Sequence, residues 1–328
     1  MLDPSTIRQA LPNALIALPL PWPHAHETGK VREVLTLPGA RRLLVTTDRL
    51  SAFDRVLAAV PYKGQVLNQL SAFWFRETAG LVANHLLEVP DANVSLVREC
   101  APLPVEVIVR GYITGVTKTA LWTLYAAGER HIYGYDFPDG LRKNDPLPTP
   151  LLTPTTKGGP GGHDERLTCA EVVERGYVEA AAWAQVTAAA LALFRRGQEV
   201  ARRAGFLLVD TKYEFGRAPD GALLLIDEVH TPDSSRFWTA AAWEQFEATV
   251  AQGRPAVEIE PWDKEYVRLW YAAQGFRGDG APPPLPENQV VELARRYIAL
   301  YEGLTGQPFV PAPLPAGPRI AEVLRSYL

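Results

Sequence analysis

The sequence of 328 residues has very little cysteine and no long apolar run, and both shortages exclude classes of protein. Its two cysteines, Cys100 and Cys169, make no disulfide framework, and neither has the Cys or His spacing of a structural zinc site. No stretch of about eighteen apolar residues occurs, so we expect no membrane-spanning helix. The first thirty residues lack a basic segment ahead of a clean apolar one, which disfavours a secretory signal. We therefore expect a cytoplasmic protein that is not associated with a membrane.

An excess of positive charge is also missing. The net charge of -4 argues against the basic surface that nucleic-acid binding normally requires. The apolar fraction of 47% and the charged fraction of 21% are those of an ordinary globular protein. A chain of this length is expected to form two lobes, each with its own share of the core.

Strand-like segments follow one another along the chain, with helical segments inserted between groups of them. Residues 28–53 predict two strands joined by a turn at Pro38-Gly39, and residues 206–226 predict a second hairpin. The absence of regular strand–helix alternation predicts an α+β fold rather than a doubly wound sheet. The pattern further predicts a strand at 104–111, a functional loop at 136–162, and helices at the N-terminus (capped by Ser5 or Thr6), at 65–81, 115–127, 170–204 with a break near Gly176, 263–274 and 287–303, and at the C-terminus.

The second hairpin carries an acidic face. Alternate residues of a strand share a face, so Asp210, Lys212 and Glu214 are expected to lie together, and the return strand ends at Asp227 and Glu228. Carboxylates beside an ammonium group suit a magnesium–nucleotide, because Mg²⁺ prefers oxygen ligands and lysine neutralises phosphate. A solvated strand face with cross-strand ion pairs is the alternative, and these residues alone leave both open.

Four other segments also allow two interpretations. The TGKVRE segment, with Lys30 and Arg32, is either a phosphate-covering turn or merely a turn. Asp48 lies in TTDRLSAFD, which is either part of a site or a capped helix start. Arg110 ends a buried strand, where its partner is either a ligand anion or a structural carboxylate. The loop TPTTKGGPGGHDE, with Lys157, is either a connector or a ligand cover.

The segment that follows the second hairpin favours a ligand site. TPDSSR combines a Pro-Asp turn with two hydroxyl groups and an arginine, a suitable clamp for phosphate or carboxylate.

Taken in order, eight segments resemble the SAICAR synthetase family, and together they cover most of the chain. They are GKVRE, TTDRLSAFD, PYKGQVLNQLSAFWF, PVEVIVRGYITG, TPTTKGGPGGHDE, DTKYEFG, DEVHTPDSSRFW and WDKEYVR. The resemblance implies an ATP-grasp-related, two-lobe α+β architecture with antiparallel sheets and flanking helices. A smaller lobe at residues 1–103 would cover ATP, and a larger lobe at 104–328 would hold the substrate and metal site.

The resemblance also implies a reaction. The family condenses 5-aminoimidazole-4-carboxylate ribonucleotide (CAIR) with L-aspartate to give SAICAR, with conversion of ATP to ADP and phosphate in purine biosynthesis. The implied route activates the CAIR carboxylate as an acyl phosphate, and ATP and Mg²⁺ are the implied cofactors. A kinase is the rival enzyme, but the sequence has no kinase-type catalytic loop. A non-catalytic nucleotide binder would lack the metal carboxylates, which are present.

Residue roles carried over from the family are expectations of the resemblance. Gly115-Val116 stands where relatives often have Gly-Ser, so a phosphate hydroxyl would have to come from Thr117 or Thr114, or be missing. The chain is expected to be either a monomer or a homo-oligomer. The implied roles are catalysis by Lys212 and Asp210, with Asp210 orienting the lysine; ATP binding by Lys30, Arg32 and Lys157; metal binding by Glu214 and Asp227; and substrate binding by Arg110, Thr117, His163, Asp164, Asp48, Asp233, Ser234, Arg236, Lys264 and Arg268.

Overall fold

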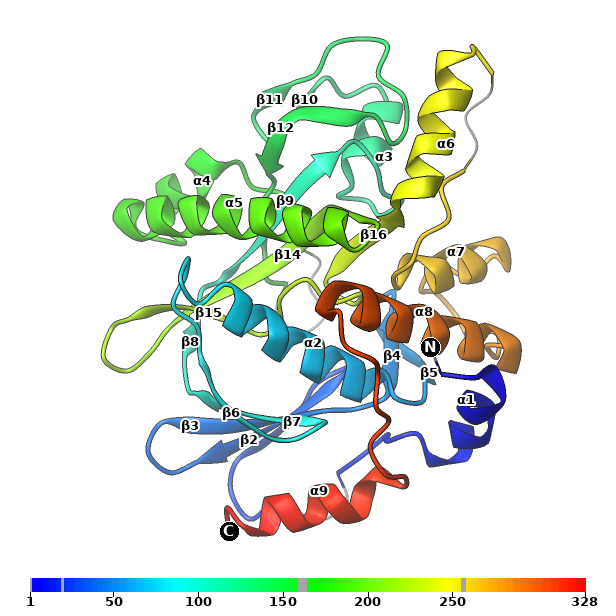
Figure 1. Cartoon of the computed structure of the whole chain (residues 1–328). Helices are drawn as coiled ribbons and strands as arrows, with labels where there is room; N and C mark the ends of the chain where they lie inside the picture. Colours follow the sequence, from blue (N-terminus) through cyan, green and yellow to red (C-terminus); the bar gives the residue numbers. More distant parts are fainter. Residues whose placement is uncertain (1, 19–20, 159–163, 255–257) are drawn as a thin grey trace.

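The computed structural model describes residues 2–18, 21–158, 164–254 and 258–328, and they form the predicted α+β fold with antiparallel sheets (Figure 1). Two large sheets organise the chain, one built from N-terminal strands and one from the middle of the sequence. No helix in these ranges is both long enough and apolar enough to cross a membrane.

The N-terminal sheet has five antiparallel strands in the order β1-β2-β3-β7-β6. Its second and third strands are joined at the predicted Pro38-Gly39 turn, and every second residue of β2 is buried. The strands β6 and β7 were not predicted. The strands are β1 (His26–Thr28), β2 (Arg32–Leu37), β3 (Arg41–Thr46), β6 (Leu86–Asp91) and β7 (Val94–Arg98), beside a separate two-stranded unit of β4 (Arg49–Ala52) and β5 (Arg55–Ala59).

The second large sheet is built around one long strand, β14, which pairs with four others. The predicted hairpin is confirmed, since Glu214 of β14 lies opposite Ile226 of the return strand. The strands are β8 (Ala101–Pro102), β9 (Val105–Tyr112), β12 (Pro146–Leu152), β13 (Thr155–Thr156), β14 (Phe206–Arg217), β15 (Leu223–Ile226) and β16 (Ser235–Thr239), beside a small unit of β10 (His131–Ile132) and β11 (Tyr135–Asp136).

Helices lie on and between these sheets. The predicted break between two helices near Gly176 is confirmed, and a helix after β16 was not predicted. The first helix is capped by the carboxylate of Asp3, which accepts from the Ser5 amide, rather than by Ser5 or Thr6. The helices are α1 (Pro4–Ala10), followed by a short 3-10 turn (Leu11–Asn13), α2 (Lys63–Glu77), α3 (Leu121–Ala126), α4 (Cys169–Glu174), α5 (Ala180–Arg203), α6 (Ala240–Ala251), α7 (Glu265–Ala273), α8 (Glu287–Thr305) and α9 (Ala316–Arg325).

Two sequence predictions require correction. The helix predicted at 115–127 is confined to α3, because Gly115 has a φ of +100° and the chain runs as a loop up to α3. The functional loop predicted at 136–162 contains β12 and β13, which both pair with β9. The three prolines at 146–150 obscured β12, and an edge strand tolerates them because one of its sides needs no amide donors.

The helix α2 connects the two halves of the molecule. Its Trp74 is fully buried against residues of β9, β14 and α5, including Val107 and Tyr213, in the largest apolar cluster. Its opposite end packs Val66 and Leu67 against α1 and α8. Burial of this kind supplies about 25 cal/mol for each Å² of apolar surface removed from water, so α2 fixes the two sheets relative to each other.

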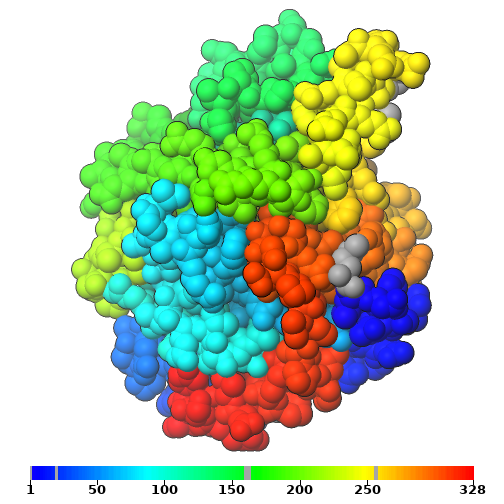
Figure 2. All heavy atoms as spheres, in the orientation of Figure 1, coloured from blue at the N-terminus to red at the C-terminus, as the bar shows by residue number. Residues whose placement is uncertain are grey.

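The C-terminal segment returns to the N-terminal sheet. Ile320 and Leu324 of α9 are fully buried against residues of β2, β3 and β7, including Leu35 and Leu43. In Figure 2 the segment between α8 and α9 runs over the surface beside α2, and the Gln65 amide donates to the Val310 carbonyl there at 2.8 Å. The domain division at residues 103 and 104 stays a prediction, and residues 316–325 lie with the first lobe in space.

Candidate active site

The alternation of β14 builds the acidic face that the sequence predicts. Thr211, Tyr213 and Phe215 are buried in the core, and this leaves Lys212 and Glu214 on the opposite face. Because β14 is paired on both edges by β9 and β15, its backbone groups are satisfied and its side-chain directions are fixed.

Lys212 is surrounded by three carboxylates. Its ammonium contacts Glu214, lies 3.4 Å from Glu106 and lies 3.6 Å from Asp227. Burial by itself lowers the pKa of Lys212, but the three negative charges outweigh it and raise that pKa well above its ordinary value. Lys157 approaches Glu214 from the other side at 2.5 Å. Lys212 is therefore a permanent cation held at the centre of an acidic cluster.

Arg32 joins the N-terminal sheet to this cluster. Its guanidinium contacts Asp227 and donates to Glu228 at 2.6 Å. Burial raises the pKa of Asp227, but Arg32 and Lys212 lower it more, so this carboxyl group stays ionised. Burial dominates for Glu228 and raises its pKa. Asp227 has a φ of +66°, a backbone conformation that is costly for a residue with a side chain.

The predicted contact between Asp210 and Lys212 is not formed. The Asp210 carboxylate pairs with Arg236 of the neighbouring strand β16 and lies 3.4 Å from Arg110 of β9. The register explains the contact, because Asp210 is opposite Arg110 on one side and Arg236 on the other. In this structure Arg110 has the carboxylate of Asp210 as its partner and donates a hydrogen bond of 2.8 Å to Thr153, and its role in substrate binding stays a prediction.

Asp233 lies among two hydrogen-bond donors and a further cation at the end of the loop after β15. The fully buried Lys63 donates to it at 2.9 Å, Tyr297 donates at 2.6 Å, and Lys264 lies 3.6 Å away. Burial raises the pKa of Asp233, but Lys264 and Lys63 lower it well below its ordinary value. Ser234, the next residue, contacts the Thr231 hydroxyl at 3.2 Å.

Two arginines and two acids extend this region. Arg236 and Arg268 both approach Glu265, at 3.7 and 3.2 Å. Asp263 is buried and accepts from the amides of Phe237 and Glu265, and burial raises its pKa to about 7. The guanidinium groups therefore meet negative charge on one side and the cavity on the other.

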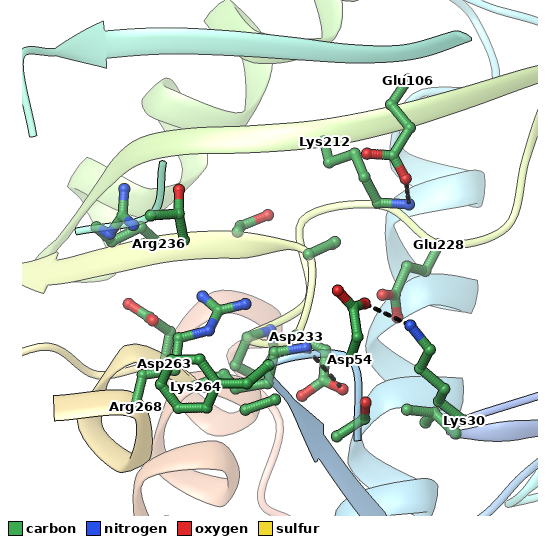
Figure 3. Close-up of a pocket in the computed structure, with 18 of the residues that line it drawn as sticks. Lys30, Asp54, Glu106, Lys212, Glu228, Asp233, Arg236, Asp263, Lys264 and Arg268 are labelled. Atoms are coloured by element: carbon green, nitrogen blue, oxygen red, sulfur yellow. Dashed lines mark hydrogen bonds and ion pairs between the residues drawn. The ribbon is translucent and has the colours of Figure 1, made fainter. Parts of the chain in front are cut away.

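Two cavities meet beneath the turn at residues 29–32. The larger, of about 550 Å³, is lined by charged residues of both lobes, and Figure 3 shows Lys212, Glu228, Asp233 and Lys264 around it. The smaller, of about 310 Å³, has an apolar wall that includes Val34 and Leu44. Residues that line both cavities are Lys30, Val31 and Arg32.

Most of the predicted site residues face these cavities. Glu214 and Asp227 line the smaller one, and Lys157 reaches the site through Glu214. His163 lies outside the described residues. The predicted residues that line the larger cavity are Lys30, Arg32, Thr117, Asp164, Asp210, Lys212, Asp233, Ser234, Arg236, Lys264 and Arg268.

The prediction that Asp48 binds substrate is wrong. This residue lines neither cavity and is 3% exposed, and its two oxygens accept from the backbone amides of Leu15 and Gly64 at 2.7 and 2.8 Å. Because both oxygens are used by the backbone, Asp48 holds the start of α2 in place and does not belong to a substrate pocket.

Several residues of the site were not predicted, among them Glu106, Lys63 and Glu228. Glu106 interrupts an apolar strand, and a charge at such a position was the available signal. Lys63 starts the amphipathic helix α2, but nothing local indicates that its side chain is fully buried. Glu228 was noted beside Asp227 and given no role, and it binds Arg32 and lines the larger cavity.

The carboxylates of the cluster fit a magnesium ion that is shared with phosphates. Glu214 and Asp227 both border the smaller cavity, and both now bind cationic side chains. Among the described residues no group of three or more His, Cys, Asp or Glu forms a complete metal site. Mg²⁺ usually takes one or two carboxylates and completes its shell with water and substrate phosphates, so two acids suffice.

A cleft between two lobes, apolar at one end and charged at the other, with a lysine among carboxylates at the junction, suits a nucleotide-dependent ligase or transferase. The SAICAR synthetase family model matches residues 25–282. The chain belongs to the SAICAR synthetase family, which consists of ATP-dependent ligases of purine biosynthesis.

Individual relatives agree with this membership. The chain is 46% identical to the phosphoribosylaminoimidazole-succinocarboxamide synthase of Legionella pneumophila (strain Lens), over 97% of this chain and all of that one. It is 44% identical to the chloroplastic enzyme of Arabidopsis thaliana, over 96% of this chain and 76% of that one. Its structure resembles the SAICAR synthase of Saccharomyces cerevisiae complexed with SAICAR, with a TM-score of 0.76, 30% identity, and coverage of 91% and 100%.

Proposed function

We propose that this chain joins CAIR to L-aspartate at the expense of ATP, through an acyl phosphate formed at the junction of the two cavities. The observation that carries the proposal is the position of Lys212. It lies in the wall of the larger cavity and contacts Glu214 and Asp227, which line the smaller one. A phosphoryl group transferred from one cavity to the other passes this lysine.

ATP occupies the smaller cavity in this proposal. Its apolar wall, with Val34, Leu44 and Ile226, suits an adenine ring. Lys30 and Arg32 of the covering turn border both cavities and suit the phosphate chain, and Lys157 is within reach through Glu214. These cations now bind carboxylates, so an incoming triphosphate exchanges one set of negative partners for another.

CAIR and L-aspartate share the larger cavity. Arg236, Lys264 and Arg268 supply positive charge for the ribonucleotide phosphate and the carboxylates. Thr117 and Asp164 contribute a hydroxyl and an acceptor at the rim. Arg110 acts indirectly, since it binds Asp210 and lines neither cavity. The role of His163 stays a prediction.

Glu214 and Asp227 would hold Mg²⁺. When bound, this ion neutralises phosphate charge and polarises the phosphoryl group that is transferred. With these two acids committed to the ion, Lys212, Arg32 and Lys157 would be left to face the phosphates. The protein therefore keeps the site close to charge balance in both states.

The proposed reaction has two covalent steps. A CAIR carboxylate oxygen attacks the γ-phosphorus, the bond to the β-phosphate oxygen breaks, and ADP leaves with that electron pair. The aspartate nitrogen attacks the acyl carbon, the bond from carbon to the phosphate oxygen breaks, and the nitrogen proton passes to the departing phosphate. Lys212 stabilises the negative charge of the transferring group, and the surrounding residues align the reactants and exclude water.

We also propose the cytosol as its location. The bacterial relatives support it, and the chloroplastic relative in a plant leaves organelles as the alternative.

Release of phosphate from ATP by purified protein tests the proposed function. We expect release only when CAIR and L-aspartate are both present, together with stoichiometric SAICAR. Trapping by hydroxylamine with CAIR and ATP alone tests the acyl phosphate, because it captures an activated carboxylate as a hydroxamate. Phosphate release that does not depend on CAIR, or does not depend on L-aspartate, would rule out the reaction.

A further inference from the structure

The turn of residues 29–32 lies at an exposed edge of the structure. It joins β1 to β2 at the edge of the N-terminal sheet, and every residue of β1 is exposed. Lys30 is about half exposed at 54%, yet it and Arg32 line both cavities. Ion pairs of Lys30 with Asp54 and of Arg32 with Asp227 and Glu228 hold the ends of these side chains, but a turn at a sheet edge is normally loose, so its backbone needs support of its own.

All four carbonyl groups of the turn accept hydrogen bonds from two residues. Arg49 donates to the carbonyls of Gly29, Lys30 and Arg32 at 2.8, 3.2 and 3.4 Å. Thr47 donates to the carbonyl of Val31 through its amide at 2.9 Å and its hydroxyl at 2.5 Å. Arg49 and Thr47 therefore hold the turn from beneath, along its whole length.

Arg49 is itself fixed from the other side. Its guanidinium contacts Glu33 and donates to the Ile16 carbonyl at 2.8 Å. Glu33 is 2% exposed and also binds His26 at 2.8 Å. Arg49 is 8% exposed and lines neither cavity, so it acts on any ligand only through the turn.

We propose that Thr47 and Arg49 are positioning residues for nucleotide binding, which hold the 29–32 turn so that Lys30 and Arg32 meet the phosphate chain. The proposal rests on the proposed function only in placing the nucleotide in the smaller cavity. Without the two donors, the turn becomes mobile and the entropy of ordering it must be overcome each time a nucleotide binds.

Arg49→Lys is the test, because a lysine cannot reproduce a planar fork that reaches three carbonyls and a carboxylate at once. We expect the KM for ATP and the Kd for ADP to rise about tenfold or more, while the KM for L-aspartate stays within about twofold. Amide hydrogen exchange at 29–33 should also become faster. Thr47→Val removes one hydroxyl at constant shape, so its effect should have the same sign and be smaller.

Arg319→Lys is the matched control. Arg319 of α9 likewise supports the N-terminal sheet through its guanidinium, which contacts Asp91 and donates to Asn93 at 2.6 Å, and it does not touch the turn. We expect it to lower thermal stability and leave nucleotide affinity unchanged. Unchanged ADP affinity in both Arg49→Lys and Thr47→Val would overturn the inference, and so would equal losses of affinity in Arg49→Lys and Arg319→Lys.

Calorimetric ADP binding keeps this test separate from that of the proposed function. A wild-type protein that binds ADP without joining CAIR to aspartate would refute the reaction alone. If Arg49→Lys then weakens ADP binding and loosens the turn, the inference about the turn is supported independently.

Discussion

Replacing Lys212 by methionine removes the cation at the centre of the site and keeps the length of the side chain. Unit charges at 3.4 to 3.6 Å interact by about 5 kcal/mol at an effective dielectric constant of 20, before burial costs are subtracted. Loss of one partner from a buried ion pair costs roughly 3–5 kcal/mol, because the other charge is left unpaired. The side chains of this cluster are between 17% and 27% exposed, so we expect a smaller loss of stability, about 2–4 kcal/mol at pH 7.5.

The pH dependence of that loss has a definite sign. In the wild type, Lys212 helps to lower the pKa of Asp227, so its contribution is present above the ordinary carboxyl pKa and is lost as the pH falls. In Lys212→Met the carboxyl groups take up protons more readily. The difference in unfolding free energy between variant and wild type should therefore shrink between pH 7.5 and pH 3, as the pH falls below the ordinary carboxyl pKa.

Two assays measure the effects of Lys212→Met. Urea unfolding at both pH values gives the stability, and phosphate release with saturating CAIR, L-aspartate and Mg-ATP gives kcat. Loss of a group that stabilises charge in the transition state typically costs 100- to 1,000-fold in kcat, and the Kd for ADP should change much less. A variant that retains more than a tenth of wild-type kcat would refute the assigned role of Lys212, and a stability loss equal at both pH values would refute the electrostatic argument.

Three further perturbations test other parts of the structure. Glu214→Gln and Asp227→Asn should lower kcat on the order of 100-fold while circular dichroism shows an intact fold, and near wild-type turnover at limiting Mg²⁺ would exclude them as metal ligands. Burial raises the pKa of Asp263 to about 7, so between about pH 4 and 7 the folded state keeps a proton that the unfolded state releases, and stability falls as the pH rises. Urea midpoints at pH 5 and 7.5 should therefore differ more in the wild type than in Asp263→Asn, and equal differences would contradict this. Gly64→Ala should destabilise by about 2 kcal/mol although it raises helix propensity, because the new methyl group would lie 2.3 Å from the Thr46 carbonyl oxygen; a raised melting temperature would contradict this.

The local sequence pattern was sufficient to predict structure wherever the periodicity of apolar residues indicates which face is buried. The alternation along residues 209–215 correctly separated the core face of β14 from its charged face. The Pro38-Gly39 turn and the break near Gly176 were found because glycine and proline restrict backbone geometry within a few residues. Order and type of motifs then indicated the family, which the comparisons confirm.

The register of the strands and the partners of the charged side chains could not be predicted from the local sequence pattern. Whether Asp210 would meet Lys212 or Arg236 depends on which strands flank β14, and β16 comes about 25 residues later in the chain. The side chain of Lys63 is buried because α2 lies between the two sheets, and it meets Asp233 across 170 residues of sequence. In neither case does the surrounding sequence predict the contact.

The sequence by itself therefore determined the fold class, the acidic strand and most of the charged groups at the site. Tertiary structure decided which of them meet: it brought Arg32 to Asp227, made Asp48 a backbone brace, and supported an exposed turn with Thr47 and Arg49. The physical reason is that periodicity encodes burial over a few residues, whereas ion pairs and hydrogen bonds depend on distances that only the packed sheets and helices fix.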